Sequence, residues 1–359
     1  KEWEETQVNL FRVQQKSLKL QQTQEAGSIF INEVKNIVVT VVAATAVIQG
    51  HMTLGMMLAV QYIIGQLNSP VEQLMNFFYS VQDVKISLER INEIHQMDDE
   101  NGKEGLLTGL DHPENGIHIS NIMFKYDPHA LRKTIDGVDI LIPQGKVTAI
   151  VGASGSGKTT LIRLMLGYYP VLEGKITIGD TDINQLNRKW WRRQCGVVMQ
   201  EGVIFSESIR RNIAVDDAEI DEARLMRAAE IACIKDYVMT LPLKFNTKIG
   251  RDGVGLSQGQ KQRILIARAV YKNPDYIFLD EATNSLDANN ERNIVENLDK
   301  FYQGKTVVIV AHRLSTVKNA DQIVVLDQGK VVEIGNHESL TAKRGAYYNL
   351  VKNQLELGN

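Results

Sequence analysis

The first part of the chain combines apolar runs with helical spacing. Residues 1 to about 28 are polar and rich in Gln, Lys and Glu, with apolar positions spaced as on an amphipathic helix. Residues 29–48 end in an uncharged apolar run, and residues 52–67 form a second run after a short Gln-Gly-His break. Each uncharged run is shorter than the about 20 residues that span a bilayer, so length alone leaves a buried soluble hairpin open.

The basic residues that flank these runs favour a membrane hairpin. Arg12, Lys16 and Lys19 precede the first run, Lys85 and Arg90 follow the second, and no Lys or Arg lies between the two runs. The positive-inside rule expects this distribution when both outer ends of a helical pair are cytoplasmic.

A change of pattern predicts a domain boundary. The helical spacing ends before the acidic, glycine-containing stretch 97–105, so we expect a helical segment over 1–96, a linker over 97–115 and a second domain over 116–359. The second domain contains β-rich runs at 117–119, 122–126, 138–142, 147–151, 174–178, 276–279, 306–310, 323–326 and 331–334, and a mostly helical stretch at 206–273. Strands that alternate with helices predict an α/β fold with a mainly parallel sheet.

Composition narrows the class of protein. The 359 residues include 40 basic and 43 acidic side chains, a net charge of −3 that gives no support to a nucleic-acid-binding surface. Cys195 and Cys233 lie in no metal or redox spacing, which is typical of reduced, small apolar residues in a cytosolic setting. The first residue is Lys1 and no signal peptide precedes the first helix, so we expect a piece of a longer polypeptide.

The strongest chemical signal is the phosphate-loop pattern at 152–159, Gly-Ala-Ser-Gly-Ser-Gly-Lys-Thr, between an apolar strand and a helix. Glycines there let several backbone amides point at one anion, and the helix that follows presents its positive end to the same charge. Lys158 is expected to contact the β- and γ-phosphates, and the Thr159 hydroxyl to bind Mg2+. The predicted ATP contacts are Gly152, Ser154, Gly155, Ser156, Gly157, Lys158, Thr159 and Thr160.

Two further elements carry candidate chemistry, and each has an ordinary alternative. Asp280 and Glu281 follow the apolar run 276–279. Asp280 suits the coordination shell of Mg2+, and Glu281 could polarise an attacking water. The alternative is that the carboxylate pair only caps the next turn. Ser257 is placed as the N-cap of a helix with Gly259 in its first turn, which suits a phosphate; an ordinary helix start is the alternative.

From about residue 28 to the end, these motifs together resemble an exporter-type subunit of an ATP-binding cassette (ABC) transporter. The resemblance implies an α/β P-loop ABC ATPase domain with an antiparallel β-subdomain and a helical subdomain, preceded by an all-α membrane-helix segment. Gln258, where glycine is commonest, and Arg251, where exporters often have glutamate, depart from the family pattern.

The resemblance assigns further roles residue by residue. Tyr126 fits the aromatic position that stacks on adenine, Gln200 the glutamine that touches Mg2+ and water, and His312 the histidine that hydrogen-bonds the γ-phosphate. The stretch 256–260, with Ser257, Gly259 and Gln260, matches the family signature, which contacts the ATP held by a second copy. Residues 285–287 match the loop that crosses the dimer interface. Implied catalytic residues are Glu281, His312, Lys158 and Gln200, and implied Mg2+ ligands are Thr159, Gln200 and Asp280.

The same resemblance implies the setting. A homodimer with two composite ATP sites would drive export across a cell (inner) membrane, with the ATP-binding domain in the cytoplasm. Family members have six membrane helices per subunit, of which the last two match here, so the first four are expected in the missing part of the polypeptide. Residues 267–287 and 68–72 look similar to bacterial exporters of peptides and bacteriocins, although multidrug and lipid exporters share most of these features. A soluble ABC-type ATPase of DNA repair or translation, or a nucleotide sensor without hydrolysis, are the alternatives.

Overall fold

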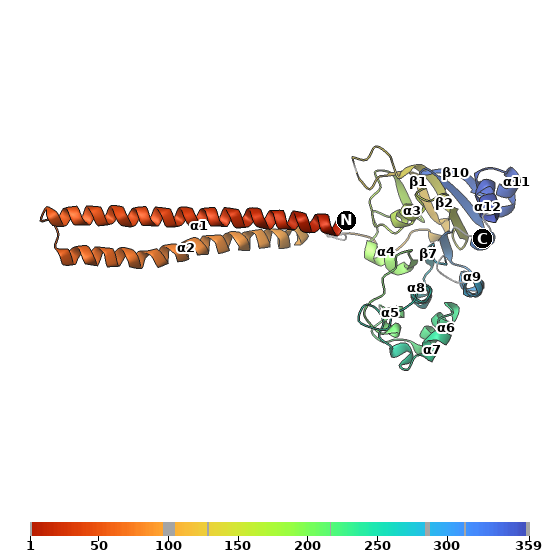
Figure 1. Ribbon diagram of the computed structural model, residues 1–359. Coiled ribbons are helices and arrows are strands. Elements are labelled where there is room, and N and C mark those ends of the chain that lie inside the picture. The colour runs from red at the N-terminus through yellow and green to blue at the C-terminus, as the bar shows by residue number, and fades with distance from the viewer. Residues whose placement is uncertain are drawn as a thin grey trace. The chain divides into compact units, whose positions relative to one another are not determined.

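The computed structural model describes residues 2–95, 105–127, 129–215, 217–283, 288–311 and 314–356. The chain divides into two compact units, Lys1–Asp98 and Asp99–Asn359 (Figure 1).

Two antiparallel helices make up the N-terminal unit, α1 (Glu2–Ile48) and α2 (Leu54–His95). Polar side chains join them, because Lys35 Nζ donates to Asn68 Oδ1 (2.6 Å) and Gln61 Nε2 donates to Thr40 Oγ1 (3.2 Å). Most large apolar side chains of both helices are exposed. A helix pair that leaves this much apolar surface uncovered needs lipid or other helices around it.

Each helix is longer than the apolar run that it contains. The polar stretch before residue 29 and the first run form one continuous helix, and α2 continues through Pro70. Among the described residues, one helix is long and apolar enough to cross a membrane: the 43-residue segment Thr6–Ile48 contains an 18-residue window with a mean hydropathy of 1.6, of which 6% is buried.

A six-stranded sheet in the order β10-β9-β3-β8-β7-β6 is the centre of the C-terminal unit. Its strands are β3 (Val147–Val151), β6 (Cys195–Val198), β7 (Tyr276–Asp280), β8 (Thr306–Val310), β9 (Gln322–Asp327) and β10 (Lys330–Gly335). All neighbouring pairs are parallel except β9 and β10. The register pairs both Ile150 of β3 and Asp280 of β7 with Val310 of β8, so the carboxyl ends of these three strands lie side by side.

The sheet confirms the predicted α/β class, and its edge strand β6 was not predicted. Its four residues, Cys-Gly-Val-Val, follow α4 directly and are too few for a recognisable strand pattern. A Cβ at Gly196 would lie 2.6 Å from Pro274 Cγ, so the close packing behind β6 requires the glycine.

A second sheet of four antiparallel strands has the order β2-β1-β4-β5. Its strands are β1 (Ile117–Phe124), β2 (Ile135–Ile142), β4 (Glu173–Ile178) and β5 (Thr181–Asp182). Residues 105–115, which the sequence assigned to a linker, pair with this region: Leu107 N donates to Gln185 O (2.8 Å) and Asp180 N donates to Asp111 O (2.9 Å). The described part of that segment is therefore held against the C-terminal unit.

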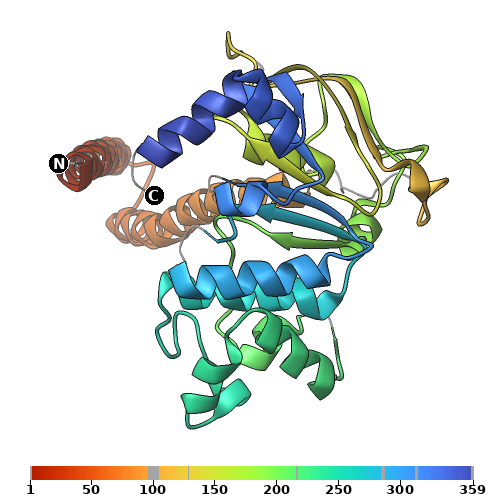
Figure 2. The same ribbon diagram turned by 90° about the vertical axis from the view of Figure 1, so that its right-hand side faces the viewer.

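Helices cover both faces of the six-stranded sheet. The described helices of the C-terminal unit are η1 (Pro113–Asn115), α3 (Lys158–Met165), α4 (Arg188–Gln194), α5 (Ile209–Ile213), α6 (Glu222–Ile231), α7 (Lys235–Thr240), η2 (Lys244–Asn246), α8 (Gln258–Lys272), α9 (Ala288–Phe301), α10 (Leu314–Val317), α11 (His337–Lys343) and α12 (Ala346–Glu356). One core packs α3 and the antiparallel sheet against one face, and the other packs α8 and α9 against the opposite face. Figure 2 shows α8 and α9, in cyan to light blue, between the sheet and the green helices α5 to α7.

Candidate active site

The phosphate loop connects β3 to α3, and its glycines are required by local geometry. A Cβ at Gly152 would collide with the carbonyl oxygen of Leu326 in β9. Gly157, the residue that caps α3, has φ 104°, and a Cβ there would lie 2.7 Å from Ile135 Cδ1 and 3.0 Å from Thr134 O. Only glycine adopts this backbone without strain. Ser154 and Gly155, at the tip of the loop, are exposed.

Lys158 is buried inside the loop that it is expected to serve. Its Nζ donates to the carbonyl oxygens of Gly152 and Ala153, both at 2.9 Å. Burial lowers the pKa of Lys158, and the nearby carboxylates of Glu281 and Asp280 raise it, with burial the larger effect. The ammonium thus donates to neutral acceptors, which a phosphate can replace with acceptors of opposite charge.

Asp280 ends β7 directly opposite the phosphate loop. Its side chain is completely buried, and Oδ1 accepts a hydrogen bond from Thr159 Oγ1 (3.1 Å). Burial is the main reason that its pKa is raised. Its other oxygen, Oδ2, has no hydrogen-bond partner in the described part of the chain.

This oxygen set fits Mg2+. The ion prefers hard oxygen ligands and binds through one or two protein groups plus phosphates and water. Asp280 supplies a buried carboxylate with an unused oxygen, and Thr159 supplies an adjacent hydroxyl. The buried Ser156 hydroxyl, also without a partner among the described residues, lies on the same loop.

Glu281 follows Asp280 with a strained backbone. Its φ is 53°, a left-handed conformation that is uncommon for a non-glycine residue, and its N–H donates to Val310 O (3.0 Å). Gln200 Nε2, from the loop after β6, donates to Glu281 Oε2 (3.2 Å). Strain of this kind often marks functional positions.

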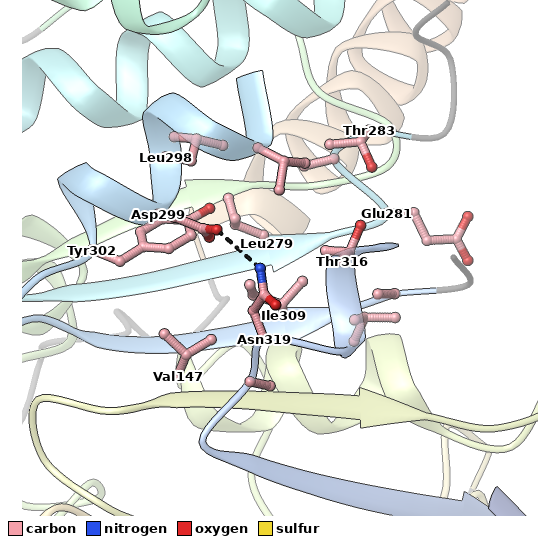
Figure 3. Close-up of a pocket in the computed structure, with 15 residues that line it drawn as sticks. Val147, Leu279, Glu281, Thr283, Leu298, Asp299, Tyr302, Ile309, Thr316 and Asn319 are labelled. Carbon is pink, nitrogen blue, oxygen red and sulfur yellow. Dashed lines mark hydrogen bonds between the residues drawn. The ribbon is translucent and has the colours of Figure 1, made fainter. Parts of the chain in front are cut away.

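A cavity of about 240 Å³ lies beside Glu281 (Figure 3). Its walls come from β3, β7, β8, α9 and α10 and are mainly apolar, and Asn319 Nδ2 donates to Asp299 Oδ2 (3.4 Å) at one side. Leu279 and Ile309 in its wall belong to the core that contains α8 and α9, whereas α3 packs on the other face of the sheet. The cavity is therefore behind the site, and does not lie between the phosphate loop and Asp280.

Tyr126, just beyond β1, stands next to the first turn of α3. Its hydroxyl lies 3.1 Å from Thr160 Oγ1, and Arg163 Nη1 donates to it (3.4 Å). The ring makes near-perpendicular contacts with Phe124 and Tyr169, and the residue remains 48% exposed. The sequence did not predict a site role for Arg163. Its position one helical turn after Thr159 is the sequence feature that could have indicated one.

The signature residues form a complete helix cap. As predicted, Ser257 is the N-cap of α8: its hydroxyl accepts from Gln260 N (3.2 Å), and Gln260 Oε1 accepts from Ser257 N (2.9 Å). Ser257 is exposed, and Gly259 lies in the first turn. No hydrogen bond between described residues joins Ser257, Gly259 or Gln260 to the phosphate loop. His312 and residues 285–287 lie outside the described residues.

Known proteins share this domain. The ABC transporter family model matches residues 135–284. The leukotoxin translocation ATP-binding proteins LktB of Mannheimia haemolytica and Bibersteinia trehalosi are each 40% identical over 314 residues, which are 88% of this chain and 44% of LktB. The chain thus spans less than half the length of these curated relatives.

A solved structure extends the similarity to three dimensions. A bacterial Atm1-family ABC exporter with ATP bound matches with a TM-score of 0.75 and 31% identity, over 90% of this chain and 58% of the exporter chain. The part of the chain that holds the phosphate loop, Asp280 and Glu281 is therefore an ABC transporter ATP-binding domain.

Proposed function

We propose that this chain is the ATP-hydrolysing subunit of an ABC exporter. The proposal depends on one observation: Lys158, Asp280 and Glu281 lie close together at the carboxyl edge of the sheet. Lys158 and Asp280 are buried, and Glu281 accepts a hydrogen bond from Gln200. Parallel sheets bind ligands at this edge. Phosphoryl transfer depends mainly on positioned charge, which these three side chains supply.

Each residue has a distinct task in this proposal. Lys158 releases its two carbonyl acceptors and binds the β- and γ-phosphates of ATP. Asp280, Thr159 and Gln200 would hold Mg2+, which would neutralise phosphate charge. Glu281 orients and polarises the attacking water as a general base. His312 is proposed to contact the γ-phosphate.

The site is proposed to be completed by a second copy of the chain. Ser257 lies exposed at the N-terminus of the 15-residue helix α8, where backbone N–H groups and the helix dipole favour an anion. On the proposed arrangement, Ser257, Gly259 and Gln260 of one copy contact the γ-phosphate held by the other. Two identical composite sites would form in a homodimer.

Membrane attachment is proposed from the helical unit. Helix α1 is apolar and exposed, which supports insertion into a cell (inner) membrane. The basic residues on the outer sides of the hairpin support an orientation with both outer ends in the cytoplasm. The similarity to an exporter structure covers 90% of the chain and so extends into the helical unit, which argues against a soluble ATPase of DNA repair or translation. A peptide is the proposed substrate, because residues 267–287 and 68–72 look similar to peptide exporters; the LktB relatives are named for leukotoxin translocation.

The replacement Glu281→Gln tests the function directly. It keeps the size and hydrogen bonding of the side chain but removes the base, so we expect ATP binding to persist, a closed dimer to accumulate and phosphate release to stop. Glu338→Gln, an exposed change in the first turn of α11, is the matched control and should hydrolyse ATP at the wild-type rate. Near-normal hydrolysis by Glu281→Gln would refute the role of Glu281.

A further inference from the structure

The ring of Tyr126 is fixed at several points although nearly half of the residue is exposed. Its centroid lies 5.0 Å from that of Phe124 and 5.3 Å from that of Tyr169, with interplanar angles of 84° and 87°. Perpendicular aromatic pairs of this kind are favourable contacts. Tyr126 is still 48% exposed, which leaves surface for a planar ligand.

The phenol oxygen of Tyr126 makes two hydrogen bonds. The guanidinium of Arg163 can only donate, so the Tyr126 oxygen accepts from Arg163 Nη1 (3.4 Å). The same phenol oxygen lies 3.1 Å from Thr160 Oγ1, where either hydroxyl can donate. Hydrogen bonds therefore join Tyr126 to both Arg163 and Thr160.

These hydrogen bonds tie the aromatic ring to the phosphate loop. Thr160 is buried, only 5% exposed, and directly follows Thr159 in the first turn of α3. Arg163 lies on the same helix. Both hydrogen-bond partners of the phenol thus belong to α3, the helix that directly follows the phosphate loop, so the position of the ring is tied to that of the loop.

We propose that Arg163 is a positioning residue for nucleotide binding: it holds Tyr126, together with Thr160, so that the exposed surface of the ring receives the nucleobase. The proposal rests on the proposed ATP-binding function. Ordering a free aromatic side chain on binding opposes affinity, and a ring already fixed avoids that loss. Arg163 acts through Tyr126 and has no contact with the phosphates in this role.

The test uses the full chain with three variants, Arg163→Met, Tyr126→Phe and the double variant. Arg163→Met removes the donor and keeps an apolar stem, and Tyr126→Phe removes only the phenol oxygen. Arg163→Met loses one hydrogen bond of the phenol and Tyr126→Phe loses both, so we expect each single variant to raise the KM and the dissociation constant for ATP about threefold to tenfold, with Tyr126→Phe at least as strong in effect. The kcat of Arg163→Met at saturating ATP should change less than about twofold, because the reacting groups are untouched.

Two readouts separate positioning from other roles. The double variant should bind ATP no more weakly than the weaker single variant, because both changes remove the hydrogen bond between Arg163 and Tyr126. Inorganic tripolyphosphate, which has no base, should inhibit Arg163→Met and wild type with the same constant. Arg292→Met, an exposed arginine of α9, is the control and should leave ATP affinity unchanged.

Three results would overturn the positioning role: an unchanged ATP affinity in a folded Arg163→Met protein, additive effects in the double variant, or a matching loss of tripolyphosphate inhibition, which would place Arg163 on the phosphates. Thermal unfolding of each variant establishes that it is folded. A wild-type chain that binds ATP without hydrolysing it would contradict the proposed function, while the binding measurements would still decide the role of Arg163.

Discussion

The buried carboxylate of Asp280 predicts a conflict between stability and function. Its side chain is 0% exposed, burial raises its pKa, and Oδ2 has no partner among the described residues. A buried polar atom left unsatisfied costs about 1–3 kcal/mol, and more when it is charged. Asp280→Asn keeps an oxygen that can accept from Thr159 and removes the charge, so it should stabilise the nucleotide-free protein.

The size of this effect follows from the same cost. The asparagine side chain still leaves one buried polar group without a partner. The expected gain in the free energy of unfolding is therefore only the cost of burying the charge, about 1–2 kcal/mol. For a domain of this size that gain raises the Tm by about 2–8 °C. In return the variant loses the proposed Mg2+ ligand, and the stabilisation by Mg-ATP, about 2.7 kcal/mol at a hundredfold excess over Kd in a competent site, should largely disappear.

The pH dependence has a definite sign. Because the pKa of Asp280 is raised in the folded state, the native protein binds more protons than the unfolded chain between the ordinary Asp pKa of about 3.9 and the raised value. The stability of the wild type therefore rises as pH falls through this window. The stability difference between Asp280→Asn and wild type should be largest at neutral pH and shrink towards acid pH.

Thermal unfolding with and without Mg-ATP, repeated over this pH range, measures these effects. The matched control is Asp275→Asn, an exposed change immediately before the same strand, which should alter neither the Tm nor the response to Mg-ATP. A lower Tm for nucleotide-free Asp280→Asn, or an undiminished Tm increase with Mg-ATP, would refute the reasoning.

Two further predictions concern the phosphate loop and the proposed composite site. Gly157→Ala should weaken ATP binding at least about tenfold, because the φ of 104° at this position and the 2.7 Å approach of a Cβ to Ile135 Cδ1 force the loop to shift. Isothermal titration measures the affinity. An affinity equal to that of the wild type would show that the loop tolerates a Cβ. Lys158→Ala and Ser257→Arg should each abolish ATP hydrolysis. In an equal mixture of the two variants, half of the dimers would contain one copy of each, and one of the two sites in such a dimer would be intact. The mixture should therefore recover about one quarter of wild-type activity. A mixture as inactive as its parts would contradict a site shared between copies.

Sequence predicted those features that depend on neighbours in the chain. The phosphate loop, the carboxylate at the end of β7 and the N-cap at Ser257 each involve residues within a few positions of one another. Their glycine, strand and capping patterns have direct physical causes, so the local structure followed from them. The mainly parallel sheet followed from the alternation of strands and helices.

Contacts between distant segments could not be predicted in this way. Arg163 and Tyr126 are 37 positions apart, and Gln200 and Glu281 are 81 apart, so only the folded sheet brings each pair together. The pairing of Leu107 with residues near 185 has the same origin, since the acidic composition of the preceding stretch suggested only solvent exposure. Side-chain patterns specify which face is buried, but not which polar groups meet across it.

The structure also shows why the proposed site would need both ATP and a partner. Lys158 already donates to two carbonyl oxygens, and the Ser257 hydroxyl already accepts from Gln260. Both parts of the proposed site thus have hydrogen-bond partners without a ligand. A hydrogen bond between neutral groups contributes about 0.5–1.5 kcal/mol and one to a charged group about 1.5–3 kcal/mol, so contacts with the charged γ-phosphate add more than contacts between two protein surfaces. On the proposed function, two copies would therefore associate weakly until the γ-phosphate adds charge between them, and would separate once hydrolysis removes it.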